Sequence, residues 1–174
     1  MNTPTLTEAE RWMKAGRQAL VSGSLASACS TAVLAWQGYS RFGKPAAPTN
    51  ATSHWLWGDD DAYLASEPSF RHTTVGYATH HASAVMWALF YERWLEETHN
   101  PSTGEIIRDA ALMTAIAAFV DYQLTPPRLR PGFETHLSRG GLLAVFAAFG
   151  VGLAAGGLMN RQHERRLERV LTLS

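Results

Sequence analysis

Two adjacent histidines lie inside a segment of apolar and small residues. They are His80 and His81, in the sequence YATHHASAVMW. A carboxylate, Asp121, interrupts a second apolar segment further along the chain. Imidazole and carboxylate groups ligate divalent metals such as zinc, copper or iron, and paired imidazoles can be the axial ligands of a haem. Imidazole also takes up and releases protons near neutral pH, so a proton path is a third alternative.

Other titratable residues can join these three if the segments that carry them lie on the same side of the fold. The seven candidate residues, which we call the histidine–carboxylate set, are His54, His72, His80, His81, Asp121, Glu134 and His136. Without a ligand, the histidines would instead hydrogen-bond to serine, threonine or backbone groups of neighbouring helices and fix helix register. The sequence leaves all four interpretations open: a metal site, a haem site, a proton path and interhelical hydrogen bonding.

No motif of a known reaction accompanies this set. The chain has no HExxH sequence, no nucleophile elbow, no phosphate-binding glycine loop and no catalytic-triad spacing. Its 15 basic and 15 acidic residues give a formal net charge of zero, which argues against nucleic-acid binding. The one cysteine, Cys29, excludes a disulfide within the chain. The sequence therefore favours a protein that is not an enzyme and does not identify a cofactor.

Four segments of low charge must position the histidine–carboxylate set. Three have no charged residue: 18–40, 73–91 and 140–160. The fourth segment begins at Ala110 and continues past Asp121 to Thr125. It reaches the length of about 20 residues that a helix needs to cross the hydrocarbon core only if Asp121 is included. A soluble four-helix bundle would carry a charged face on each helix, and these segments have none. We therefore predict an all-α, four-span transmembrane helix bundle that forms a single membrane domain, residues 1–174, with spans at about 18–40, 73–93, 108–125 and 139–160.

Residues at the expected helix ends support these spans. Thr7 with Glu10, and Ser102 with Glu105, have the spacing of an N-terminal capping box. Thr125 is followed by two prolines, which cannot continue a helical hydrogen-bond ladder. We expect helices to begin after the two boxes and the third long helix to end at Thr125.

Four spans would place both chain ends on one side of the membrane. That side collects the larger share of the lysines and arginines, so the positive-inside rule places both termini in the cytoplasm. All histidines except His99 and His163 gather toward the opposite face. His72, Gly76 and His80 are four residues apart and form a polar stripe that must face the interior of the bundle.

A long connection, residues 41–72, joins the first two spans. It exceeds an ordinary loop, and loops of this length are often functional. Trp55, Trp57 and Tyr63 within it suit the headgroup level of a membrane. We expect a short interfacial helix that folds over the bundle and carries His54 toward the other histidines.

Small residues are spaced for close contacts between helices. Gly152 and Gly156 form a GxxxG motif in the last span, and Gly23 and Ser27 form a similar pair in the first. Lipid gives helices no hydrophobic reason to associate, so small residues that allow close van der Waals contact mark interfaces. These pairs predict either a seam within the chain or the face of a homodimer. The lipid bilayer and other membrane subunits are the further expected partners.

Several segments resemble small bacterial inner-membrane proteins of the YagU-like kind. The similarity lies in PTNATSHWLWGD, GYATHHASAVMWALFYE, VDYQLTPPRLRPGFE and a last helix rich in glycine and alanine. It consists of the layout and of a few residues: a second span that bears histidines and a third that ends in TPP. The resemblance implies a four-span inner-membrane protein and carries over no catalytic residues. The chain departs from the pattern at its histidine pair.

These observations lead us to expect a multi-pass protein of the bacterial inner membrane with both termini in the cytoplasm. Its role would be non-catalytic: structural, related to stress, or accessory to a larger complex. It would have a polar, histidine-lined pocket near one membrane face. The alternative is a metal- or haem-binding membrane protein in redox chemistry or transport, including proton transfer.

Overall fold

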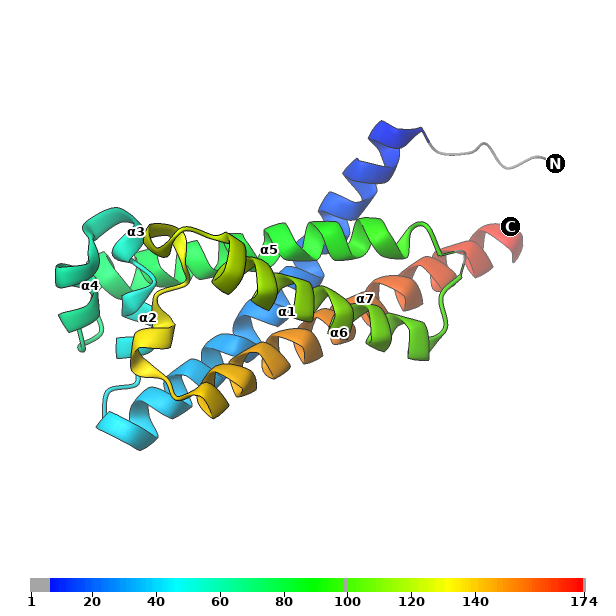
Figure 1. Ribbon diagram of the computed structural model, residues 1–174. Coiled ribbons are helices and arrows are strands. Elements are labelled where there is room, and N and C mark those ends of the chain that lie inside the picture. Colours follow the sequence, from blue (N-terminus) through cyan, green and yellow to red (C-terminus); the bar gives the residue numbers. More distant parts are fainter. Residues whose placement is uncertain (1–6, 99, 174) are drawn as a thin grey trace.

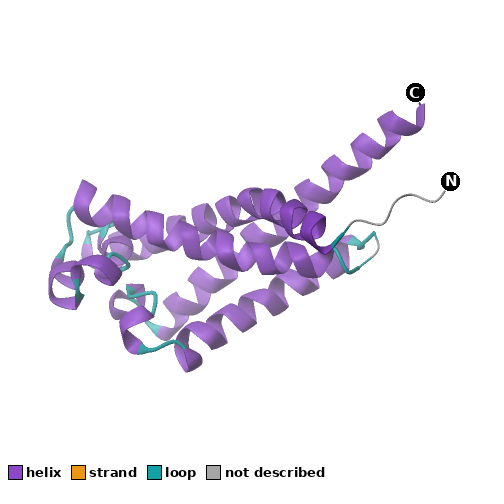
Figure 2. Cartoon of the chain, turned by 90° about the horizontal axis from the view of Figure 1, so that it is seen from above, coloured by secondary structure: helices purple, strands orange, loops and turns teal. Residues whose placement is uncertain are grey.

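Four long helices lie side by side in the computed structural model, which describes residues 7–98 and 100–173 (Figure 1). They are α1 (Glu8–Phe42), α5 (Val75–Leu95), α6 (Thr103–Phe119) and α7 (Arg139–Leu173). The described residues contain no strand, so the all-α prediction is confirmed. α1 begins and α7 ends toward the same end of the bundle (Figure 1 and Figure 2). His99 lies outside the described residues.

Both predicted capping boxes are present. The Thr7 hydroxyl accepts a hydrogen bond from the Glu10 amide at 3.3 Å, and the Glu10 carboxylate accepts one from the Thr7 amide at 2.8 Å. Ser102 and Glu105 make the same reciprocal pair at the start of α6. At its other end, α1 stops at Gly43, which has a φ of 68° that a residue without a Cβ adopts at little cost.

Wide helical turns extend two of the long helices. The π-helix η1 (Phe70–Thr74) leads into α5, and the π-helix η2 (Val120–Leu124) follows α6. η2 stops at Thr125, before the two prolines, as the sequence predicts. A π-helical turn shifts side chains from the regular α-helical register, and the turn in η2 contains Asp121.

Within the described residues, two helices are long and apolar enough to cross a membrane. They are α1 and the part of α7 from Arg139 to Val170. α6 has 17 residues and is short for a span. α5 contains histidine, threonine and serine, which lower its hydropathy. By length and composition the structure thus supports two of the four predicted spans, although all four predicted segments are largely helical.

α1 turns small and polar side chains toward the core and large apolar ones outward. It packs extensively against both α5 and α7. Its buried residues are Ala15, Ala19, Ser22, Gly23, Ala26, Ser27, Ser30, Leu34, Gln37 and Gly38. Its large exposed residues include Leu20, Val21, Trp36 and Tyr39. Leu34 is therefore the exception on a buried face made of residues that allow close approach.

Glycines bring α1 into close contact with both neighbours. A Cβ atom at Gly152 would lie 2.4 Å from the Cα of Ala26, and one at Gly156 would lie 2.2 Å from the Cα of Ser22. On another side of α1, Gly23 packs closely against α5. The GxxxG motif and Gly23 therefore occupy seams within the chain, which is one of the two arrangements that the sequence left open.

Short helices cover the end of the bundle that is opposite the chain ends (Figure 1). We call them the cap: α2 (Ala47–Ala51), α3 (His54–Trp57), α4 (Asp59–Leu64), and the 3-10 helices η3 (Pro127–Leu129) and η4 (Phe133–His136). Every residue of α2 is buried, and η4 packs against it. The long connection after α1 thus folds over the bundle, as three short helices where the sequence suggested one.

A buried asparagine holds part of the cap together. Asn50 donates hydrogen bonds to two backbone carbonyls of the segment after α4, both at 2.9 Å. Its side-chain oxygen accepts a hydrogen bond from the Thr73 hydroxyl at 2.7 Å. α5 approaches closely here, because a Cβ at Gly76 would lie 2.1 Å from the Thr49 carbonyl oxygen. The cap is therefore fixed to the start of α5.

Candidate functional site

His54 is the buried anchor of the cap. Its Nε2 donates to the carbonyl oxygen of Arg130 at 2.9 Å. Its Nδ1 lies 2.8 Å from a carboxylate oxygen of Asp59 and 3.1 Å from the Tyr63 hydroxyl. Burial and the nearby Asp59 carboxylate raise the pKa of Tyr63 to about 12, so its hydroxyl stays protonated at neutral pH. The Nε2 bond thus joins α3 to the segment between η3 and η4, and the Nδ1 contacts join α3 to α4.

Further contacts fasten the same two parts of the cap. The Arg128 guanidinium donates to the backbone carbonyl oxygens of His54 and Trp55. The Trp55 indole in turn donates to the carbonyl oxygen of Arg130 at 2.8 Å. The connection between α6 and α7 is thereby held on the connection between α1 and α5, so side chains from both can line one cavity.

The adjacent histidines both face α1. His80 Nε2 lies 2.8 Å from the Ser30 hydroxyl, and His81 Nδ1 lies 2.8 Å from the Ser27 hydroxyl. The two serines lie about one helical turn apart on α1. These contacts are hydrogen bonds between helices that fix the register of α5 against α1.

The remaining members of the histidine–carboxylate set lie in or beside the cap. His72 Nδ1 lies 3.0 Å from the Ser53 hydroxyl. Glu134 accepts a hydrogen bond from the Tyr122 hydroxyl at 3.3 Å. Burial lowers the pKa of His136 below its ordinary value, which favours the neutral ring. These residues take part in separate local contacts.

The described residues contain no group of three His, Cys, Asp or Glu side chains that could hold a metal ion. The histidine–carboxylate set is instead divided among the cap, the α1–α5 interface and a cavity. The ring nitrogens of His54 face a carbonyl, a carboxylate and a hydroxyl, and those bonds would have to break before a ligand could bind there.

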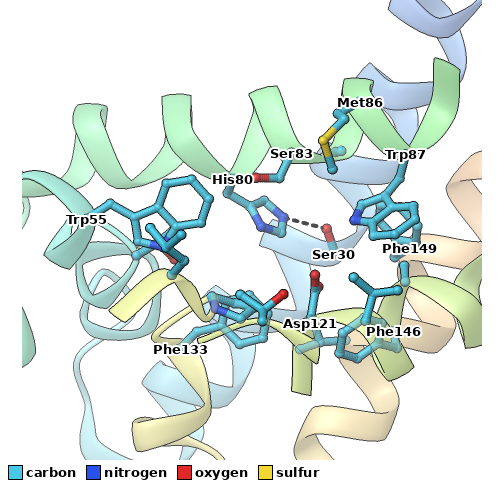
Figure 3. Close-up of a pocket in the computed structure, with 18 residues that line it drawn as sticks. Ser30, Trp55, His80, Ser83, Met86, Trp87, Asp121, Phe133, Phe146 and Phe149 are labelled. Atoms are coloured by element: carbon cyan, nitrogen blue, oxygen red, sulfur yellow. Dashed lines mark hydrogen bonds between the residues drawn. The ribbon is translucent and has the colours of Figure 1, made fainter. Parts of the chain in front are cut away.

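A cavity of about 220 Å³ lies beneath the cap and is bounded by all four long helices (Figure 3). Five aromatic side chains line it: Trp55, Trp87, Phe133, Phe146 and Phe149. Met86 and Leu129 also line it, and they are 46% and 48% exposed on the outside of the protein. The cavity is therefore partly open and not sealed inside the bundle.

Two titratable side chains face this cavity from opposite walls, His80 from α5 and Asp121 from η2 (Figure 3). His80 is hydrogen-bonded to Ser30. Asp121 has neither a hydrogen bond nor an ion pair with any described residue. A carboxylate in apolar surroundings is unfavourable unless a proton or a cation partners it. The pocket expected to be lined by histidines is thus lined by one histidine, one unpaired carboxylate and aromatic rings.

A buried ion network lies at the opposite end of the bundle, where α1, α5 and α7 meet. The Arg161 guanidinium donates to three carboxylates at 2.7–2.8 Å: Glu92, Glu96 and Glu164. Glu92 is fully buried and also accepts a hydrogen bond from Asn160 at 2.8 Å. A buried carboxylate is tolerated only with such partners, so these contacts hold α5 and α7 together.

α1 joins the same network through Lys14. Its ammonium group lies 2.7 Å from Glu96 and also contacts Glu164. Burial alone would lower the pKa of Lys14, but hydrogen bonds with Glu164 and Glu96 outweigh it and raise that pKa. Burial likewise would raise the pKa of Glu96, but hydrogen bonds from Lys14 and Arg161 hold it below its usual range. Both groups therefore stay charged at neutral pH.

The sequence interpretation missed this network and the aromatic wall of the cavity. Glu92 and Arg161 each follow an uncharged segment directly, and the sequence does not show which helix each of them faces. A signal was present, because Glu92 and Glu96, like Arg161 and Glu164, are spaced to share one helix face. The aromatic rings of the cavity come from elements that are distant in sequence, and no local spacing reveals them.

The resemblance to YagU-like proteins stays a prediction. Comparison of this chain with models of protein families, with curated proteins and with solved structures gave no match.

Proposed function

We propose that this chain is a four-span protein of the bacterial inner membrane that holds a small lipid-soluble molecule and catalyses no reaction. The observation that carries the proposal is that all four long helices turn large apolar side chains outward. Examples, one from each helix, are Leu20, Phe90, Ile116 and Val151, which are 40–66% exposed. In water such a surface would drive association, whereas in a bilayer it faces lipid.

The distribution of charge along the helices supports this proposal. α1 has no charged residue between Arg17 and Arg41, and α7 has none between Arg139 and Arg161. At about 1.5 Å per residue, each interval is longer than the hydrocarbon core of about 30 Å. Charged side chains of these two helices therefore fall at the levels where a bilayer meets water.

The two shorter helices reach the needed length with their π-helical extensions. η1 and α5 run without a break from Phe70 to Leu95, and α6 and η2 run from Thr103 to Leu124. At about 1.5 Å per residue these stretches measure about 39 and 33 Å, against a core of about 30 Å. Asp121, within the second stretch, faces the cavity, which is where an intramembrane carboxylate belongs.

Exposed tryptophans occur toward both ends of the bundle. Trp12 and Trp94 lie toward the chain ends, and Trp36 and Trp57 toward the cap, with exposures of 39–65%. Along α1, Trp12 and Trp36 are about 36 Å apart at 1.5 Å per residue. This separation fits two headgroup regions on either side of the hydrocarbon core, where tryptophan is enriched.

The distribution of basic residues supports the sidedness of the protein in the membrane, and the cavity supports its role. The larger share of basic residues lies with the chain ends, so we place that end in the cytoplasm and the cap in the periplasm. We assign a holding role to the cavity because its aromatic wall, with few polar groups, suits an apolar molecule.

Labelling of single cysteines tests the topology. In a Cys29→Ala background, Asp60→Cys and Arg139→Cys place thiols near the cap, and Glu97→Cys places one at the other end. A membrane-impermeant maleimide should label the first two in intact spheroplasts and the third only after permeabilisation. Labelling of Asp60→Cys and Arg139→Cys from opposite sides of the membrane would contradict the four spans.

A further inference from the structure

Asp121 gives the cavity a negative charge that the wall does not balance. None of the described residues that line the cavity is a lysine or an arginine. Glu134 lies near enough to add to the negative potential at Asp121. No hydrogen bond joins Asp121 to His80, which is bonded to Ser30. The described wall thus supplies no counter-charge, and a cation from outside the chain would provide one.

The rest of the wall suits an organic cation better than a metal ion. A hard metal cation needs several oxygen ligands, and the described residues offer no group of three ligating side chains. The negative faces of aromatic rings instead attract an ammonium group whose charge is covered by alkyl substituents. Five such rings surround the cavity (Figure 3).

The volume of the cavity limits the size of its ligand. At about 220 Å³ it is larger than an apolar cavity of about 150 Å³ that admits benzene in another protein. One ring with small substituents therefore fits inside. Because the cavity is partly open, and Met86 and Leu129 in its wall are 46% and 48% exposed, a longer alkyl chain can extend outward.

We propose, on the basis of the membrane function above, that the cavity binds a small lipophilic ammonium ion. Asp121 is its counter-ion, and the aromatic rings surround the charged group. His80 keeps its hydrogen bond to Ser30 and forms the opposite wall. The ligand class is thus an amine or quaternary ammonium compound with one ring or short alkyl groups.

Two compounds of the same shape test the requirement for charge. Benzyltrimethylammonium carries a positive charge, and neopentylbenzene is its neutral carbon isostere. Binding of each to the full-length protein in detergent is measured by calorimetry and by tryptophan fluorescence, since Trp55 and Trp87 line the cavity. We expect the cation to bind to the wild-type protein at least about tenfold more tightly than its isostere.

A matched pair of variants tests the assignment of the counter-ion. Asp121→Asn keeps the shape of the side chain and removes its charge. We expect it to weaken binding of the cation by about tenfold or more and to leave binding of neopentylbenzene unchanged. Asp60→Asn makes the same chemical change at an exposed position of the cap and should keep both wild-type affinities.

Each other outcome overturns part of the proposal. Equal affinities of the wild-type protein for the two compounds, or an unchanged affinity of Asp121→Asn for the cation, would refute the ammonium ligand and leave the holding function intact. If the wild-type protein binds neither compound, both the ammonium ligand and the holding function are wrong. If Asp121→Asn does not fold, the comparison of the two compounds on the wild-type protein decides.

Discussion

Glu96 links cations from two different helices, Lys14 in α1 and Arg161 in α7. Burial alone would raise the pKa of Glu96, but these two hydrogen bonds outweigh it and hold the pKa below the ordinary value of 4.5. A carboxylate with a depressed pKa in the folded state stabilises the fold fully above its unfolded pKa. That stabilisation is lost as the pH falls through the folded pKa.

Glu96→Gln should therefore lower stability at pH 7 and have less effect in acid. We expect a loss of about 1.5–3 kcal/mol at pH 7, the range for hydrogen bonds to a charged group. The difference from wild type should shrink below a pH of about 4.5, in thermal unfolding measured in detergent from pH 7 to pH 3. Glu97→Gln, at an exposed neighbouring position, is the control and should stay within about 0.5 kcal/mol of wild type. A difference that does not change with pH would contradict this account.

Single residues also show what sequence reasoning can find in such a chain. His80 and Asp121 could be identified because a titratable residue in an apolar membrane segment has to turn away from lipid, toward the interior of the bundle. The pairing of Glu92 with Arg161 was not, because it depends on which helix faces which. The unpaired state of Asp121 likewise appears only once the wall around it is assembled.

The contact between α1 and α7 depends on glycine. Gly152→Ala should destabilise the protein by about 1–3 kcal/mol, because its Cβ would lie 2.4 Å from the Cα of Ala26 and the helices would have to separate. Unfolding by increasing SDS in mixed micelles measures the loss. Gly140→Ala lies in the same helix with no atom within 4 Å of the added Cβ, so it should be neutral or slightly stabilising. Equal losses in the two variants would argue against a close seam.

Elements differ in how well the sequence predicts them. The starts of α1 and α6 are set by local hydrogen bonds of Thr7 and Ser102, so they could be located from spacing alone. The short α-helices of the cap, α2, α3 and α4, could not, since helices of this length are unstable alone and form through tertiary contacts. Asn50, which bonds to two distant carbonyls, supplies such contacts.

At the scale of the whole molecule, a charged substitution at an exposed apolar position tests whether the bundle is surrounded by lipid or by water. Val151 is 66% exposed near the middle of the apolar part of α7. In water, Val151→Arg would change stability by no more than about 0.5 kcal/mol. In a membrane, we expect a penalty of about 2.5–3.5 kcal/mol for arginine at the centre of a span.

Extraction of bacterial membranes with alkaline carbonate measures this difference. Val151→Arg should lower the fraction of the protein that resists extraction. Leu167→Arg introduces the same side chain at a position of α7 that is also exposed but lies beyond the apolar segment, and it should match wild type. Complete tolerance of Val151→Arg would place α7 in water.

The exposure of Met86, a residue of the cavity wall, has a consequence for how the cavity is supplied. Met86 lies about halfway along α5, at a level that the proposed arrangement surrounds with acyl chains. A solute entering there is drawn from the bilayer, where its concentration follows its membrane–water partition coefficient. Occupancy would then rise with the lipophilicity of the solute, and diluting it into more vesicles at a fixed total amount would empty the cavity.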